Sequence, residues 1–276
     1  MTIQRTTHPD YDEQYKYVLR ADDVYYDRIK DKGSMYLPIA GSMPADGSEA
    51  TAAFNNYKLH KYNTTTLPMA VFYNFSNLSL GGYIGAIMRK PPMIKFNEGD
   101  DDSVLDYMID NVDGKGNGLT QVARKALVSQ YLKGRAGYLV SVPAMGNLAE
   151  VTTGVKVPRI VPFDSQNILD WDTDYRDGVE VLTSLLLTEN ARARTDGQLC
   201  DEERLIKYML TDEGVTYEIT KGDETESGTL MKAGKAATSI PFHYAGAVNN
   251  DWAQDPAPMR TLIDLNLQHY LMYNRD

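Results

Sequence analysis

The sequence predicts an α+β fold, in which N-terminal helices precede a mixed α/β domain with an antiparallel sheet and the chain finishes in a further helix. Apolar residues recur at helical spacing in much of the chain before residue 134. After residue 135, short alternating or continuous apolar segments are separated by turn residues, which is typical of strands. Helical spacing returns after residue 256. These three observations predict a β-rich middle with helices before and after it.

The composition indicates a folded protein with an acidic balance. Of its 276 residues, 42% are hydrophobic and 24% are charged, which suffices for one large or two small domains. Acidic residues outnumber basic ones by 38 to 28, which disfavours a sequence-specific DNA binder because such proteins bind phosphates through basic surfaces. An acidic surface would suit a channel through which DNA slides without adhering, and it is also common in proteins that are merely soluble.

The sequence carries no sign of a membrane or secretory segment. No apolar stretch approaches the roughly 18 residues that a membrane helix needs, and the N-terminus lacks an apolar signal core. We therefore expect no membrane association. The single cysteine, Cys200, excludes an intrachain disulfide and fits folding in a reducing cytoplasm.

The N-terminal part is predicted to be mainly helical. A broken apolar face predicts one helix, or two short helices, over residues 12–30, and a Gly-, Ser- and Pro-rich segment predicts a loop over residues 40–51. Pro68 is expected to separate one helix from another over about residues 69–80. The pair Gly81-Gly82 is expected to loosen the end of that second helix.

A glycine-rich turn and a helix are predicted before the first strand. Residues 113–118 lack the spacing of a phosphate-binding loop and are expected to connect two helices, with Asn117 capping the second. Gly134 is expected to end that helix in the left-handed conformation, so that the chain can reverse into a strand over residues 136–142.

The middle of the chain is predicted to be β-rich. The segment over residues 179–188 has apolar residues on both faces and is therefore expected to be a central strand. Polar composition predicts loops over residues 189–203 and 221–227. The other predicted strands cover residues 159–163, the hairpin 204–211 and 215–220, and an edge strand at 229–231.

The C-terminal part predicts a strand over residues 240–244, a loop over 246–257 and a helix. Asp255 is expected to cap this helix and Pro256 to begin it. No stop signal follows, so we expect the chain to be the front part of a longer protein that continues past Asp276. The apolar face of the helix comprises Met259, Leu262, Ile263, Leu267, Tyr270 and Tyr273.

This C-terminal order resembles the portal proteins of tailed bacteriophages, in which a strand, a polar loop and a long helix lead from an outer wing domain into the stem helix. A portal-like subfamily, catalogued as a domain of unknown function, has a similar N-terminal order. Tyr36-Leu37-Pro38, the tyrosines Tyr57 and Tyr62, and the run from Ile84 to Pro92, which ends in Arg-Lys-Pro-Pro, match it. The sequence departs from the pattern at Lys61-Tyr62-Asn63, where an arginine and an alanine are expected.

A further match lies at Gly134-Arg135-Ala136-Gly137-Tyr138-Leu139-Val140, which is similar to the turn that opens the wing sheet in portals. The resemblance implies a division into an N-terminal arm and helix over residues 1–34, a wing-type α+β domain over 35–255 and the start of a stem helix over 256–276.

The resemblance implies a structural role in the virion. Portal subunits form a ring, usually of twelve, at one capsid vertex, where the ring contacts capsid protein, the terminase motor and tail adaptor proteins. Double-stranded DNA passes through the ring without specific binding during packaging and ejection. On this interpretation the C-terminal helix supplies the channel or stem residues. The candidates are Arg260, Asp264, Arg275 and Asp276.

Candidate catalytic, cofactor or metal sites are not evident, and we expect no enzyme activity. Asp100, Asp101 and Asp102 are adjacent and suit the N-terminus of a helix over residues 104–110 better than a metal site. Acidic neighbours would make Cys200 a poor nucleophile. The four histidines, His8, His60, His243 and His269, lack ligand spacing.

The alternative prediction is a monomeric α+β module that binds carbohydrate or peptide through its β-rich half. The chain has 19 tyrosines, and exposed aromatic side chains could stack on a ligand.

Overall fold

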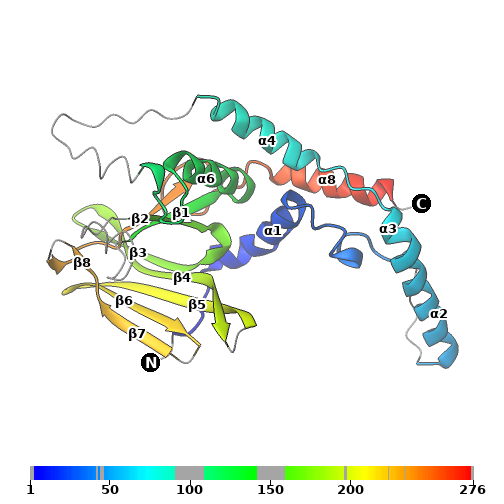
Figure 1. Ribbon diagram of the computed structural model, residues 1–276, viewed down its shortest axis with the longest axis horizontal. Helices are drawn as coiled ribbons and strands as arrows, with labels where there is room; N and C mark the ends of the chain where they lie inside the picture. Colours follow the sequence, from blue (N-terminus) through cyan, green and yellow to red (C-terminus); the bar gives the residue numbers. More distant parts are fainter. Residues whose placement is uncertain are drawn as a thin grey trace. The chain divides into compact units, whose positions relative to one another are not determined.

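The computed structural model combines helices, antiparallel sheets and a C-terminal helix, which confirms the predicted α+β class (Figure 1). Asp100–Asp102, Arg275 and Asp276 lie outside the part that it describes. The described residues are 3–41, 43, 47–90, 109–141, 159–195, 198–222, 224–232 and 234–274.

The chain divides into two compact units. Residues 1–18 and 90–257 form the first, here called the β-rich unit, and residues 19–89 and 258–276 form the second, here called the helical unit. Three consecutive ranges, 1–34, 35–255 and 256–276, were the expected division. The two divisions differ because the C-terminal helix packs with helices from the first third of the chain, which sequence order alone does not reveal.

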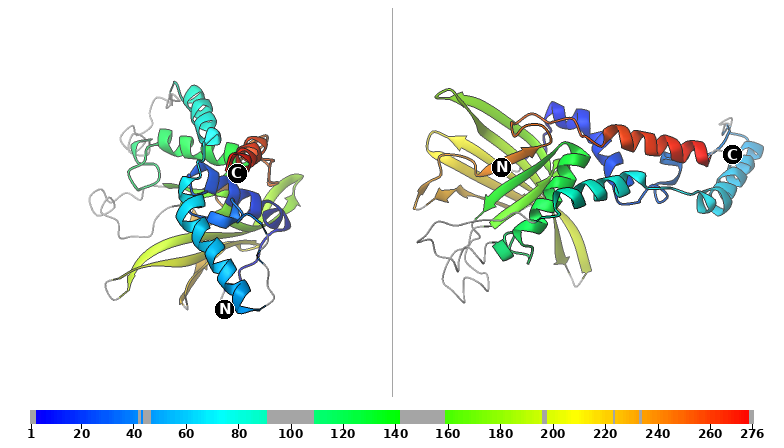
Figure 2. Two further views of the ribbon diagram at one scale, coloured as in Figure 1. Left: turned by 90° about the vertical axis from the view of Figure 1, so that its right-hand side faces the viewer. Right: turned by 90° about the horizontal axis from the view of Figure 1, so that it is seen from above.

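The β-rich unit contains two main antiparallel sheets (Figures 1 and 2). One has the order β10-β1-β2, formed by β1 (Arg135–Ser141), β2 (Arg159–Asp164) and β10 (Phe242–Gly246). The other has the order β3-β4-β5-β6-β7. Its strands are β3 (Ile168–Arg176), β4 (Val179–Thr195), β5 (Gln198–Thr211), β6 (Gly214–Lys221) and β7 (Glu224–Thr229). A small ladder joins β8 (Met231–Lys232) and β9 (Lys235–Ala236).

The strand predictions are confirmed where apolar alternation or turn chemistry was clear. β4 lies between β3 and β5, as its two apolar faces predict, and β5 and β6 form the expected hairpin with Thr211 opposite Gly214. The edge strand is β7, which precedes the predicted position at residues 229–231.

Both predicted polar loops are wrong. Residues 189–203 extend β4 and β5 into one long hairpin, paired as far as Thr195 and Gln198, and residues 221–227 lie in the β6–β7 hairpin. A hairpin satisfies its backbone groups across the ladder without needing an apolar face, so polar composition did not distinguish it from a loop.

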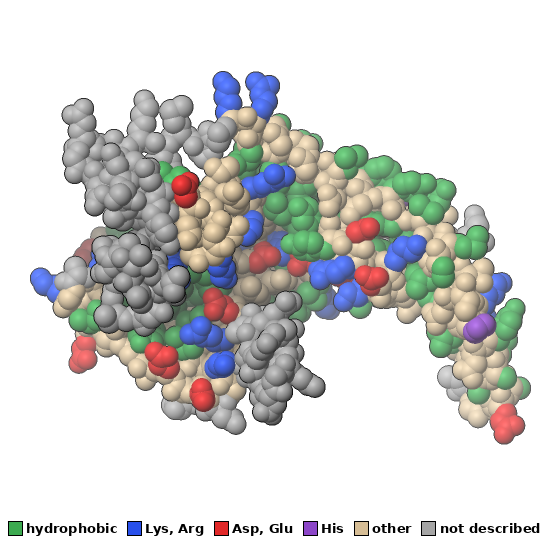
Figure 3. Space-filling model, viewed as in Figure 1, with side chains coloured by type: hydrophobic (Ala, Val, Ile, Leu, Met, Phe, Trp, Pro, Cys, Tyr) green, Lys and Arg blue, Asp and Glu red, His purple; other side chains and the backbone are tan. Residues whose placement is uncertain are grey.

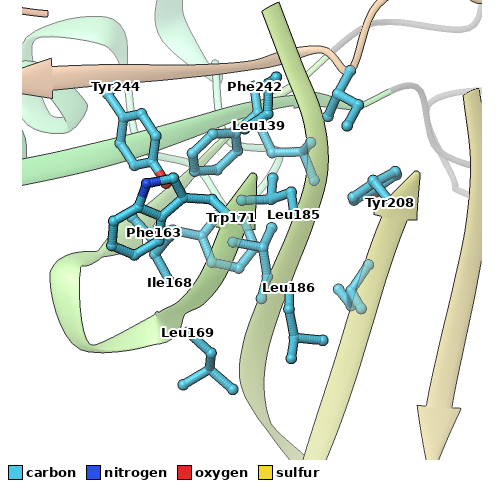
Figure 4. Close-up of a cluster of buried hydrophobic side chains, with 14 of the residues drawn as sticks. Leu139, Phe163, Ile168, Leu169, Trp171, Leu185, Leu186, Tyr208, Phe242 and Tyr244 are labelled. Atoms are coloured by element: carbon cyan, nitrogen blue, oxygen red, sulfur yellow. The ribbon is translucent and has the colours of Figure 1, made fainter. Parts of the chain in front are cut away.

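The core of the β-rich unit lies between the two sheets. Leu139 and Phe242 of the smaller sheet lie beside Leu185 of β4, as Figure 4 shows, and each is at most 5% exposed. Ile168 and Leu187, opposite each other on β3 and β4, are fully buried. The helix α6 (Leu119–Lys133) precedes β1 and ends, as predicted, at Gly134 in the left-handed conformation (φ 88°).

Arg135 is a buried charge beside this core. Its side chain is 1% exposed, and its guanidinium carbon lies 4.0 Å from the ring centroid of Trp171 and 5.0 Å from that of Tyr244. Figure 4 shows these two rings next to each other. None of its guanidinium nitrogens has a hydrogen-bond partner among the described residues. Burial therefore lowers the pKa of Arg135, while the two aromatic faces attract the cation.

We expect Arg135→Met to leave the free energy of unfolding unchanged or to raise it by about 1–4 kcal/mol, because an apolar side chain of similar volume removes the desolvation penalty. Arg135→Ala should lower it by about 2–5 kcal/mol, because it leaves a cavity. Urea unfolding followed by tryptophan fluorescence measures both changes. A loss above about 2 kcal/mol for the methionine variant would show that the charge itself stabilises the fold.

The helical unit is built from helices at both ends of the chain. α1 (Pro9–Tyr25) begins in the β-rich unit and ends here. The other helices are α2 (Glu49–Lys61), the π-helical η2 (Tyr62–Thr66), α3 (Leu67–Met69), α4 (Phe75–Ile87) and α8 (Arg260–Tyr273), with a 3-10 turn, η1, at Gly33–Met35. Within the described part of the chain, no helix combines the length and apolar character needed to cross a membrane.

Two helix limits in this unit differ from those expected. The first helix ends at Tyr25 instead of residue 30, and the helix expected after Pro68 begins only at Phe75. Asn74 explains the second difference, because its side chain accepts a hydrogen bond from the Asn77 amide and donates one to the Val24 carbonyl. The cap therefore fixes the start of α4 against the end of α1.

Two predicted caps are also wrong. Asp255 does not cap α8, which begins at Arg260, because its carboxylate accepts hydrogen bonds from the amides of Val248 and Asn249. Asn117 does not cap α6, because its side chain donates to Asp113. In both cases the side chain hydrogen-bonds to a residue of the loop that precedes the helix and does not cap the helix.

Candidate interaction surface

α8 packs against the segment that leads into α4 (Figures 1 and 2). Asn266 is 2% exposed, and its side-chain oxygen accepts a hydrogen bond from the Ser76 amide while its nitrogen donates to the Tyr73 carbonyl. Near the end of α8, Asn274 bonds both the amide and the carbonyl of Val71. The side-chain amides of Asn266 and Asn274 therefore hydrogen-bond to backbone groups of residues 71–76 and hold α8 against this segment.

The apolar face predicted for the C-terminal helix is only partly buried. Four of its members are buried, namely Met259, Ile263, Leu267 and Tyr270. Tyr273 is instead 57% exposed. Leu265, Leu271 and Met272, which the predicted face omits, are also exposed. The helix therefore has apolar side chains on two sides, and its own chain covers only one.

The charged candidates on α8 do not form a site. Asp264 lies 3.5 Å from Arg20 of α1, and both side chains are about two-fifths exposed, so this surface ion pair adds little to stability. Arg260 is exposed at the first turn of α8. Arg275 and Asp276 lie outside the described residues.

Among the described residues, most of the exposed large hydrophobic side chains belong to the helical unit, although it is the smaller unit. The β-rich unit exposes Tyr15, Val140, Tyr175, Val179, Met209, Met231 and Val248 among its described residues. Figure 3 shows hydrophobic side chains at the surface along the helices of the helical unit. The helical unit exposes Leu19, Tyr26, Met35, Met43, Phe54, Tyr57, Leu59, Met69, Val71, Tyr73, Phe75, Leu78, Tyr83, Ile87, Leu265, Leu271, Met272 and Tyr273.

One part of this surface is an aromatic cluster of Tyr73, Phe75, His269 and Tyr273. The His269 ring lies 5.6 Å from Phe75 and 5.8 Å from Tyr273, and Tyr73 lies 5.7 Å from Tyr273, between ring centroids. Tyr73 and Phe75 are 43% and 46% exposed. The lone histidine therefore packs among aromatic rings.

A second part is the outer side of α4, here called the glycine face and defined as Leu78, Gly81, Gly82 and Gly85. The helix has no charged residue, and its inner side chains Leu80 and Ile84 are buried. A Cβ atom added to any of the three glycines would meet no atom within 4 Å. Each interior glycine costs about 0.5–1 kcal/mol relative to alanine, and no described residue packs closely enough on this face to require one.

A third part is α2, which has no buried residue. One side is held to the loop before it, because Lys58 donates to the Ala40 carbonyl and the following Tyr62 donates to the Leu37 carbonyl. The side that carries Ala53 and Tyr57 is exposed, and the Phe54 ring at its margin lies 4.8 Å from the Lys58 ammonium. A helix of 13 residues is marginal in water without tertiary packing, so α2 needs a partner on its open side.

The site residues predicted from the sequence are all charged, so α2 and the glycine face are not among them. The sequence signal for the glycine face is the uncharged segment from Phe75 to Ile87, which contains three glycines. Gly81 and Gly82 were expected to loosen the helix end, with a further helical turn or a strand over residues 83–88, and α4 continues as a helix to Ile87.

The described residues offer little else for binding or chemistry. They contain no group of three or more His, Cys, Asp or Glu side chains that could hold a metal ion. A shallow hollow of about 300 Å³ on β5, β6 and β7 is lined mainly by polar side chains such as Lys207, Thr216 and Glu218. The uncovered helical surface is therefore the strongest candidate for function. In comparisons with known proteins, no protein-family model and no curated protein matches this chain.

Proposed function

We propose that this chain is a subunit of a tailed-bacteriophage portal, which assembles into a ring at one capsid vertex. The observation that carries the proposal is the set of exposed apolar side chains on the helical unit, which the described part of the chain leaves uncovered. Monomeric soluble proteins rarely expose large apolar patches, so neighbouring subunits would cover these side chains. The resemblance at Tyr36-Leu37-Pro38, Ile84 to Pro92 and Gly134 to Val140 supplies the family.

The size of this surface suits a ring subunit. At roughly 150–250 Å² for each aromatic side chain and somewhat less for each aliphatic one, the exposed fractions amount to an area on the order of 1,500 Å². A stable interface takes about 800 Å² from each partner. A ring subunit has two neighbours, so the exposed apolar area is of the size that two such interfaces require.

The charge distribution is compatible with this role. The helical unit holds 9 of the 28 basic and 8 of the 38 acidic residues, so the net charge of −10 comes from the β-rich unit. A nearly neutral helical unit can pack against its copies without strong repulsion. The acidic unit would repel the DNA backbone, which favours passage over adhesion.

In this proposal the subunit acts through shape and not through bond chemistry. The ring would provide a channel for double-stranded DNA and a docking surface for the terminase motor, the tail adaptor proteins and the surrounding capsid protein in the virion. α8 would be the first part of the stem helix.

The alternative, a carbohydrate- or peptide-binding module, receives less support. Stacking would need exposed aromatic side chains on the β-rich unit, and Tyr15 and Tyr175 are the only such residues among those described there. Tyr175 lies at the tip of the β3–β4 hairpin, away from the polar hollow on β5, β6 and β7. A stacking platform is therefore not evident in the half that the alternative would use.

We expect the full-length protein to form a ring of about twelve subunits, because only neighbouring copies would cover the apolar helices. Light scattering gives the particle mass, and electron micrographs of the same chromatographic peak show whether a central hole is present. A clean monomer of the full-length protein at micromolar concentration would contradict the proposal and favour the binding module.

A further inference from the structure

We propose that α2 of one copy packs antiparallel on the glycine face of α4 in the next copy. This inference rests on the proposed function, because a ring places identical chains side by side. It goes further by assigning the two surfaces that meet. The juxtaposition pairs the exposed side of α2 with a helix face that consists of three glycines and Leu78.

The glycine face fits a close helix–helix contact. Gly81, Gly82 and Gly85 are exposed, and the space above each is open to beyond 4 Å. Glycines at this spacing let two helix backbones approach more closely than larger side chains allow. Leu78, 75% exposed, lies on the same face near the start of α4 and could pack beside an incoming helix.

α2 has the side chains that such a face would accept. Ala50, Ala53, Phe54 and Tyr57 follow the spacing i, i+3, i+4 and i+7 and therefore lie on one side of the helix. All four are exposed. The Tyr57 ring would fill the space above the partner's glycines, while the alanines would keep the backbones close, and Phe54, whose ring lies 4.8 Å from the Lys58 ammonium, would lie at the margin of the contact.

Charge complementarity sets the direction of packing. α2 has Glu49 in its first turn and Lys58 and Lys61 in its last, whereas α4 is uncharged and is followed by Arg89. An antiparallel arrangement brings Glu49 to the partner's Arg89 and places both lysines at the uncharged start of α4. A parallel arrangement would place the lysines beside Arg89, where like charges repel.

A second copy is the partner that this pairing identifies. Within the chain, α2 makes its main contacts with η2, and α4 makes its main contacts with α8, so the two surfaces do not cover each other. They are different surfaces of one chain, so the contact is heterologous. Repetition of a heterologous contact closes into a ring when the rotation permits.

Disulfide cross-linking of the full-length protein tests the contact. In a Cys200→Ser background, a Tyr57→Cys chain mixed with a Gly82→Cys chain should give a covalent dimer under mild oxidation, because the two positions face each other across copies. Each chain alone should give at least tenfold less dimer. Met35→Cys, also at an exposed position, replaces Tyr57→Cys in the matched control and should not cross-link to Gly82→Cys.

A glycine variant supplies a second readout. The triple change of Gly81, Gly82 and Gly85 to alanine should favour helix formation in the isolated chain, yet weaken assembly at least tenfold because the added methyl groups separate the backbones. Circular dichroism of the dissociated protein confirms that the variant folds. The exposed Met35→Ala variant should assemble like the original protein.

The outcomes separate this inference from the proposed function. Intact rings that give no Tyr57–Gly82 cross-link, and that tolerate the three alanines, would overturn the α2–α4 contact and leave the ring proposal standing. An unaltered protein that forms no ring, but gives the cross-link in a smaller oligomer, would retain the contact and overturn the ring. Cross-linked rings that the alanine variant disrupts would support both.

Discussion

Gly134→Ala is expected to destabilise the β-rich unit by at least about 3 kcal/mol, because it combines backbone strain with a backbone clash. Gly134 has φ 88°, a conformation that alanine adopts at a cost of roughly 1–2 kcal/mol. In addition, a Cβ atom would lie 2.1 Å from the carbonyl oxygen of Asp255. That backbone is not free to move, because the Asp255 carboxylate holds the amides of Val248 and Asn249.

Urea unfolding followed by tryptophan fluorescence measures this loss of stability in the β-rich unit, because Trp171 and Trp252 both belong to that unit. Gly178→Ala is the matched control. Gly178 also has a positive φ, 77°, but an added Cβ would meet nothing within 4 Å. The control should therefore lose only about 1–2 kcal/mol, from strain alone. Equal losses in the two variants would show that the contact with Asp255 contributes nothing.

The parts of the fold that the sequence predicts well are those with short-range causes. The helix up to Lys133, its glycine stop and the following strand come from helical spacing followed by a residue that tolerates φ above zero. The hairpin between β5 and β6 follows from alternation and an Asp-Glu-Gly turn. Neither prediction requires knowledge of a distant contact.

The prediction errors have two sources. A polar side chain can hydrogen-bond either as a helix cap or within a loop, and a strand can be stabilised by backbone pairing without burying apolar side chains. Asp255 and Asn117 are both good capping residues, but the structure uses their side chains in the adjacent loops. The extension of β4 and β5 beyond Thr188 and Leu205 is polar, and only its cross-strand register makes it a strand. Residue preferences alone do not rank such alternatives.

The candidate surface illustrates a further limit. The sequence shows three glycines in α4 and scattered aromatic residues, but it does not show which sides of α2, α4 and α8 the chain covers. That depends on contacts such as Asn266 with Ser76, which join residues 190 positions apart. Exposure is therefore a property of the tertiary structure. The charged residues chosen on α8, by contrast, are ordinary surface groups.

Asp164→Asn is expected to lower the free energy of unfolding of the same unit by about 3 kcal/mol, because it removes the ion pair between Asp164 and the buried Lys133. Lys133, at the end of α6, is 2% exposed and pairs directly with Asp164 at the end of β2. The other carboxylate oxygen accepts a hydrogen bond from the Ser165 amide and lies 2.6 Å from the Ser129 hydroxyl. An amide can keep one of these contacts but cannot compensate the ammonium charge.

Two companion variants test this explanation. Lys133→Met combined with Asp164→Asn removes the buried charge as well, so the double variant should be more stable than Asp164→Asn alone by about 1–3 kcal/mol. Glu203→Gln breaks the ion pair between Glu203 and Arg5, whose side chains are 43% and 49% exposed. It should lower the free energy of unfolding by at most about 1 kcal/mol. If the double variant is no more stable than Asp164→Asn, the loss comes from the hydrogen bonds of Asp164. In that case the loss of the Lys133–Asp164 ion pair is not its cause.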